Sequence, residues 1–160
     1  MTPFSRRFCT GFILILLILM TGCTSTRFKN SNFSGAEWSH SEGQAIWKMG
    51  KNTPEIAGDI LYFKGKEGSV ALQFSKSPFP VLLTQVHSSG WQIELLTEKK
   101  TFSGDGKVPG KYGPLPLGWV VLSSLLAGNP APAGWEYQKE SDGNFRLTNP
   151  KTGETLNGFL

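Results

Sequence analysis

The stretch Val70-Ala71-Leu72-Gln73-Phe74-Ser75 decides the fold class, because its large apolar side chains stand at every second position. Alternate residues of an extended strand point to the same face of a sheet, so this pattern predicts a half-buried antiparallel strand. The same period of two recurs at Trp91-Gln92-Ile93-Glu94-Leu95 and at Phe145-Arg146-Leu147. The chain is therefore predicted to be built mainly from antiparallel strands.

Glycine and polar residues separate this chain into short strands. Hairpin turns are predicted at Lys64-Gly65-Lys66-Glu67-Gly68, Ser88-Ser89-Gly90 and Ser141-Asp142-Gly143-Asn144. Ser103-Gly104-Asp105-Gly106-Lys107 lacks the spacing of a phosphate-binding loop and is also interpreted as a turn. The expected strands cover residues 45–49, 56–64, 69–76, 81–87, 90–98, 135–140 and 144–149, with 155–160 as a possible eighth strand.

One segment departs from the strand pattern and predicts a short helix. It reads Leu115-Pro116-Leu117-Gly118-Trp119-Val120-Val121-Leu122-Ser123-Ser124-Leu125-Leu126-Ala127-Gly128, with proline at its start and glycine at its end, where helices favour them. Two adjacent valines keep a strand as the alternative. Because apolar residues surround most of this helix, we expect it to be buried.

The expected sheet has more apolar face than this helix can cover. Seven strands make a sheet about 34 Å wide, whereas an eleven-residue helix is about 16 Å long and about 10 Å across. The fold class is therefore mainly β (α+β), with a curved antiparallel sheet, or incomplete β-barrel, and a short apolar helix as a lid. Either the sheet's own side chains fill the inside, or an apolar hollow remains that binds acyl chains. The hollow is predicted to be lined by Ile60, Tyr62, Val70, Leu72, Phe74, Trp91, Ile93, Leu95, Trp119 and Leu122.

The N-terminus has the layout of a bacterial lipoprotein signal. The apolar run Phe12–Met20 follows two arginines and is too short for a membrane span, which needs about 20 residues. Met20-Thr21-Gly22-Cys23 is close to the lipobox, in which the cysteine is lipidated and becomes the first residue. An ordinary secretory signal is the alternative. We expect a signal peptide over 1–22, a lipidated, palmitate-bearing N-terminus and flexible tether over 23–44, and a sheet domain over 45–160.

Removal of the signal peptide changes the charge and the number of cysteines. The 160-residue chain has 16 Lys+Arg and 12 Asp+Glu, a formal net charge of +4. Loss of Arg6 and Arg7 leaves 14 basic residues, a net charge of +2, which gives no support for nucleic-acid binding. Loss of Cys9 leaves Cys23 as the only thiol, which excludes a disulfide and a cysteine metal site.

Few residues suggest an enzyme. His87 lies beside Ser88 and Ser89, but no G-x-S-x-G motif accompanies them, and His40 lies in the expected tether. The sequence therefore predicts no catalytic residues, no metal site and no cofactor.

Phe79 has an unusual setting in the stretch Lys76-Ser77-Pro78-Phe79-Pro80, where two prolines flank a bulky aromatic between two expected strands. Prolines remove backbone donors and stop a strand from simply continuing. Phe79 is expected either to lie in the core or to point outward and insert into a membrane or a partner.

The order of these features resembles the LolB/LolA family of outer-membrane lipoprotein receptors and periplasmic carriers. A lipobox, a polar tether, strands, a proline-led apolar loop and a further hairpin precede Pro116-Leu117-Gly118-Trp119 and Leu125-Leu126-Ala127-Gly128. The most similar stretch is Gly113–Gly128, and Thr101-Phe102-Ser103 resembles the short strand before it. The resemblance covers roughly residues 55–160. It implies an incomplete barrel whose short helices cover a cavity for acyl chains.

The resemblance also implies a location and partners. Phe79 occupies a place comparable to the receptor's exposed apolar residue, which serves delivery of lipoproteins to the membrane. Thr24 after Cys23 is not the aspartate that retains lipoproteins in the inner membrane, so we expect a monomeric, non-enzymatic protein on the periplasmic side of the outer membrane. Its partners are then the membrane, through the lipid anchor, and other lipoproteins or lipids. The alternative function is a structural envelope lipoprotein with a closed core, acting as an interaction module.

Overall fold

The computed structural model of the chain describes residues 38–109 and 115–160. All described residues belong to one compact unit. The predicted signal peptide, Cys23 and most of the predicted tether lie outside the described residues.

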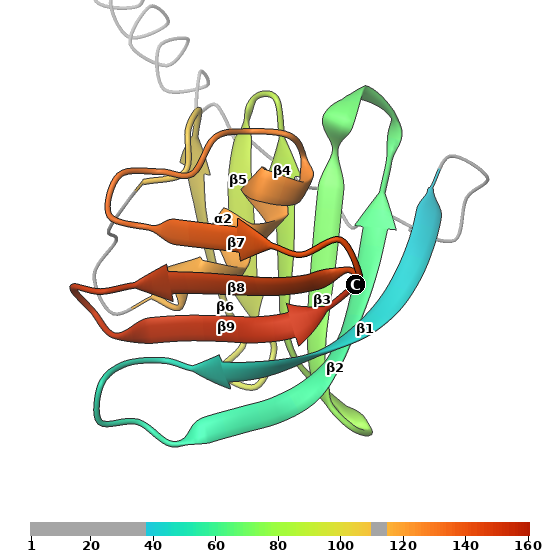
Figure 1. The fold of residues 1–160 in the computed structure, drawn as a ribbon. Helices are drawn as coiled ribbons and strands as arrows, with labels where there is room; N and C mark the ends of the chain where they lie inside the picture. Colours follow the sequence, from blue (N-terminus) through green and yellow to red (C-terminus); the bar gives the residue numbers. More distant parts are fainter. Residues whose placement is uncertain (1–37, 110–114) are drawn as a thin grey trace, which may run out of the picture. The chain divides into compact units, whose positions relative to one another are not determined.

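The nine strands of the described residues form one antiparallel sheet, in the order β6-β5-β4-β3-β2-β1-β9-β8-β7 (Figure 1). The strands are β1 Ser39–Lys48, β2 Glu55–Lys64, β3 Val70–Lys76, β4 Phe79–His87, β5 Gly90–Leu95, β6 Lys100–Asp105, β7 Glu136–Lys139, β8 Asn144–Asn149 and β9 Glu154–Phe159. Helix α2, Leu117–Leu126, follows β6 along the chain. The predicted fold class is confirmed: the protein is mainly β, and its curved sheet is not closed into a barrel.

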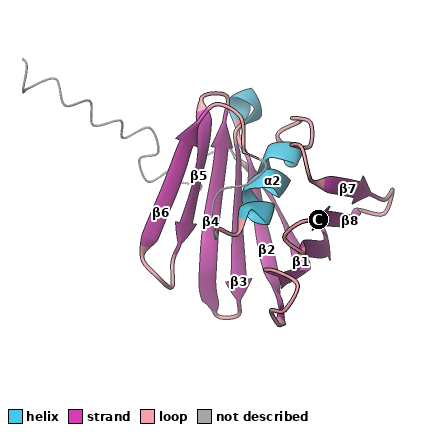
Figure 2. Cartoon of the chain, turned by 90° about the vertical axis from the view of Figure 1, so that its left-hand side faces the viewer, coloured by secondary structure: helices cyan, strands magenta, loops and turns pink. Residues whose placement is uncertain are grey.

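The sheet curves around α2, which lies against its concave face. Figure 1 shows β7, β8 and β9 running across the direction of β3, β4 and β5, with α2 between the two groups. Figure 2 shows the same arrangement from the side. The helix contacts β3, β4 and β5 on one side and β8 and β9 on the other. The segment predicted as helix is thus helical, and the alternative that it forms a strand is wrong.

Small residues stand in one row across the most curved part of the sheet. Gly58 of β2 is opposite Ala45 of β1, which is opposite Gly158 of β9. The ring of Phe74 occupies the space above Gly58, where an added Cβ would stand 2.6 Å from Cε2 of that ring. The missing side chains let neighbouring strands and the core approach this bend closely.

Two segments differ from the sequence-based prediction. Strand β1 begins at Ser39, although residues up to 44 were predicted as tether, because backbone hydrogen bonds to β2 do not depend on the polar side chains there. Strand β6 was not among the strands expected from periodicity, and it extends to Asp105 through part of the predicted turn, paired with β5. The turn itself begins at Gly106, whose φ of 72° suits glycine.

Gly58→Ala tests whether the bend depends on this close approach. We expect the substitution to lower the free energy of unfolding by about 1–3 kcal/mol, because the added methyl overlaps the buried Phe74 ring. Urea unfolding followed by circular dichroism measures the change. Gly50→Ala is the control, since its nearest atom outside the local chain is 3.5 Å away. Equal midpoints for the two variants would contradict this account of the bend.

Candidate functional site

The concave face is packed with apolar side chains from the sheet and from α2. Most of the ten residues predicted to line an acyl-binding hollow are less than 3% exposed, and only Tyr62 and Leu95 are partly buried. The fully buried ones are Ile60, Val70, Leu72, Phe74, Trp91, Ile93, Trp119 and Leu122. None of the ten lines either of the two hollows described below. The described side chains of this face are thus closely packed against one another and against α2.

Three aromatic rings join α2 to both parts of the sheet. The Phe74 and Trp119 ring centroids are 4.6 Å apart, and Trp47 meets each of them edge-on at 6.0 Å. Edge-to-face pairs at this spacing contribute about 0.5–1.5 kcal/mol each beyond area burial. Since these rings come from β1, β3 and α2, their contacts hold the helix in the bend. Trp47 was not predicted as part of this face, because it belongs to a strand whose first half is polar.

Glu154 of β9 is a buried carboxylate at the start of α2. It is 4% exposed, and its Oε1 accepts hydrogen bonds from the backbone N–H of Gly118 at 3.0 Å and from Nε1 of Trp47 at 3.3 Å. The residue before the helix, Pro116, provides no side-chain cap, so Glu154 takes over the role of a capping residue. A Cβ at position 118 would stand 2.8 Å from the carboxylate oxygen, so a larger residue there would displace the Glu154 side chain.

Burial raises the pKa of Glu154 from 4.5 to about 7, although the hydrogen bonds from Gly118 and Trp47 act in the opposite direction. No cation contacts this carboxyl group among the described residues. The glutamate therefore carries a proton for part of the time near neutral pH.

A second polar link joins α2 to the middle of the sheet. The hydroxyls of Thr84 on β4 and Ser123 on α2 are 2.6 Å apart, and both side chains are fully buried. Ser123 Oγ also lies 2.9 Å from the carbonyl oxygen of Trp119, and Thr84 Oγ1 lies 3.4 Å from that of Leu72. The two hydroxyls thus satisfy each other inside the apolar core.

Glu154→Gln tests the buried carboxyl group. Because the folded pKa is the higher one, the folded chain binds more protons than the unfolded chain between pH 4.5 and pH 7. The free energy of unfolding contributed by this group therefore falls as the pH rises through that window, by about 3 kcal/mol in total. We expect the glutamine variant, which keeps the acceptor oxygen, to lack this decrease.

Urea unfolding of both proteins at several pH values measures the effect. The difference in stability between them isolates Glu154, since the other titrating groups are common to both. A difference that stays constant between pH 4.5 and pH 8 would contradict the raised pKa.

Phe79 lies at the tip of the β3–β4 hairpin and points outward. Its side chain is 71% exposed, the largest exposure among the large hydrophobic residues described. Phe79 pairs with Lys76 at the end of the ladder, and Ser77-Pro78 forms the two-residue turn between them, with a cis peptide bond. Of the two positions expected from the sequence, core or outward, the Phe79 side chain therefore has the outward one.

His87 lies beside a hollow of about 550 Å³ near the C-terminal end of α2. Its Nδ1 is 3.0 Å from Oγ of Ser69, and burial lowers the pKa of the imidazole. The hollow is walled mostly by small and apolar residues, among them Val86, Val108 and Ala127.

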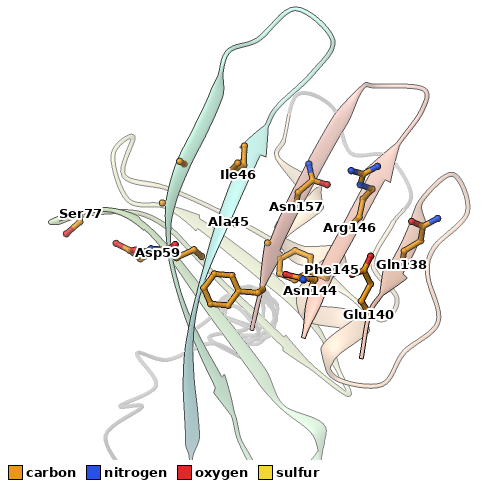
Figure 3. A pocket seen from close by; sticks show the side chains of 15 residues that line it. Ala45, Ile46, Asp59, Ser77, Gln138, Glu140, Asn144, Phe145, Arg146 and Asn157 are labelled. Atoms are coloured by element: carbon orange, nitrogen blue, oxygen red, sulfur yellow. Dashed lines mark hydrogen bonds between the residues drawn. The ribbon is translucent and has the colours of Figure 1, made fainter. Parts of the chain in front are cut away.

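A larger hollow of about 920 Å³ lies on the outer face of the sheet, over β2, β1, β9, β8 and β7 (Figure 3). We call it the outer groove. Its polar side chains include Asn157, Arg146, Gln138 and Glu140. Sequence reasoning missed it, because polar residues at alternate positions of a strand look like an ordinary solvated face.

Within residues 38–109 and 115–160, no group of three or more His, Cys, Asp or Glu side chains could hold a metal ion. None of the helices in these ranges has the length and apolar character that crossing a membrane requires.

Comparison with known proteins leaves the family open. No protein-family model matches the chain, and no curated protein matches it. Functional inference therefore rests on the geometry of the described residues and on the sequence patterns.

Proposed function

We propose that this chain is a lipid-anchored, non-enzymatic protein of the bacterial envelope, of the LolB/LolA kind, that contacts a membrane through Phe79. The observation that carries the proposal is the exposed aromatic ring at the tip of the β3–β4 hairpin. The Phe79 side chain is 71% exposed, and the transfer of this apolar surface from water into the acyl region of a membrane is favourable.

The surroundings of the ring support this proposal. Lys76 is exposed on the facing strand, directly opposite Phe79, and can approach anionic headgroups. One apolar ring alone binds a membrane weakly, but a second contact beside a lipid anchor acts at high local concentration. The proposed anchor at Cys23 and the proposed contact at Phe79 thus serve together at one membrane.

Phe79→Glu tests the contact, with Phe79→Leu as the conservative control. In chains of residues 24–160, which lack both the apolar signal segment and Cys23, we expect the glutamate to reduce binding to phosphatidylglycerol-containing vesicles about tenfold and leucine to retain most of it. Vesicle sedimentation measures the bound fraction. Melting temperatures should agree among all variants, since the ring is exposed. Equal binding by the glutamate variant would refute the membrane contact.

A second candidate function is acyl-chain binding on the concave face. The indole N–H of Trp119 favours it, because this buried donor has no hydrogen-bond partner among the described residues and an ester carbonyl would accept it. Since α2 now fills this face, the helix must move outward before a chain can enter.

A disulfide between β4 and α2 separates the two candidates. Thr84 and Ser123 have hydroxyl oxygens 2.6 Å apart, so cysteines there lie within reach of a bond. If acyl chains enter under α2, the oxidised Thr84→Cys/Ser123→Cys protein should lose co-purifying lipid and hydrophobic-dye binding, and reduction should restore them. Vesicle binding that is unchanged in both states supports the membrane contact through Phe79, which does not require α2 to move. Dye uptake that is equal in both states would exclude entry under α2.

A further inference from the structure

The outer groove has a regular construction, because it follows the pairing of the strands. Ile46 of β1 is opposite Asn157 of β9, which is opposite Arg146 of β8, which is opposite Gln138 of β7. This row of four side chains crosses about 14 Å of sheet at the usual strand spacing. Figure 3 shows these side chains on one side of the strands.

A second row runs beside the first, two residues further along each strand. It contains Asp59 of β2, Gln44 of β1, Phe159 of β9 and Asn144 of β8. Nε2 of Gln44 donates to Oδ1 of Asp59 at 3.4 Å, and Nδ2 of Asn144 donates to Oδ2 of Asp142 at 2.6 Å. These bonds hold two of the amide groups in place.

Other polar groups in the outer groove have free hydrogen-bonding capacity. Oδ1 of Asn157 is inaccessible to solvent and has no partner among the described residues. Within the same part of the chain, the guanidinium of Arg146 forms no ion pair. The Arg146 side chain is exposed, so its guanidinium donors are open to a ligand in the outer groove.

Apolar side chains complete the floor of the outer groove. Ile46 is 44% exposed and Phe159 is 45% exposed, although both are large and hydrophobic. An exposed aromatic ring among amide groups offers a flat apolar surface next to donors and acceptors.

The chemistry of this set selects a class of ligand. Four carboxamides supply both donors and acceptors, Arg146 supplies donors only, and the carboxylates Asp59 and Glu140 supply acceptors only. With one positive and two negative groups, the outer groove does not attract polyanions such as nucleic acids, and its polar content does not suit an acyl chain. A sugar hydroxyl both donates and accepts, and the C–H face of a sugar ring packs on an aromatic ring.

We propose that the outer groove binds an oligosaccharide. Its volume of about 920 Å³ lies in the range of small-molecule sites and accommodates a few sugar rings. In this arrangement Phe159 packs on a ring, while the exposed side chains of Arg146 and Gln138 form hydrogen bonds to ring substituents. The site is separate from the hairpin tip at Phe79, and it stands whether or not that tip contacts a membrane.

Isothermal titration calorimetry of the full chain tests the proposal, in a zwitterionic detergent without sugar headgroups. The probes are tri-N-acetylchitotriose and maltotriose, which carry the same number of rings with and without N-acetyl groups. Binding of either one supports the site, and the tighter of the two identifies the class of glycan.

Two variants locate the binding. We expect Arg146→Gln and Phe159→Ala each to raise the dissociation constant about tenfold. Thr155→Ala is the matched control, because Thr155 lies on the same face of β9 but outside the outer groove, and it should leave the constant unchanged. The proposal is wrong if neither sugar binds at millimolar concentration, or if both variants bind as the unaltered protein does. Melting curves confirm that each variant is folded.

Discussion

The hydrogen bonds that Glu154 accepts from Gly118 and Trp47 connect the three parts of this domain. They join β9, the first turn of α2 and β1 at one carboxylate oxygen, at the place where the sheet turns across itself. A carboxylate suits the N-terminus of a helix, because unpaired backbone N–H groups and the helix dipole meet there. The burial that excludes water from these hydrogen bonds also raises the pKa of Glu154. The strength of the link therefore depends on pH.

The concave face is closely packed, and both proposed functional surfaces lie elsewhere on the domain. The helix occupies the apolar space that a carrier would offer to acyl chains, with Trp119, Val120, Val121 and Leu122 fully buried. The accessible surfaces of the described residues include the aromatic tip at Phe79, the outer groove and the smaller hollow beside His87. The exposed ring and the polar outer groove differ in chemistry, so the two proposals concern different ligands, a membrane and a glycan.

Much of the fold could be predicted, because burial on one face leaves a period of two in strands such as β3, β5 and β8. The apolar helix was recognisable for the same reason, since residues buried on all sides must be apolar all round. The first half of β1 could not be predicted, because its order comes from backbone pairing with β2 and leaves no pattern in its side chains. The outward position of Phe79 depends on the pairing with Lys76, which the sequence left open between two alternatives.

The interior site was the hardest part to predict. Glu154 stands in a stretch of alternating residues and looks like a solvated glutamate, and only the arrival of Gly118 from a distant segment buries it. The outer groove arises in the same way, because it combines side chains of β1 and β2 with side chains of β7, β8 and β9, which are far away in the sequence.

Native-state hydrogen exchange measures most directly whether α2 is an integral part of the core. Because two aromatic contacts, the Glu154 link and the Thr84–Ser123 pair hold α2, we predict that its amides exchange as slowly as those of β3 and β4, through global unfolding. Exchange of α2 that is faster by a hundredfold or more than that of β3 and β4 would show a separately opening helix and would contradict the account.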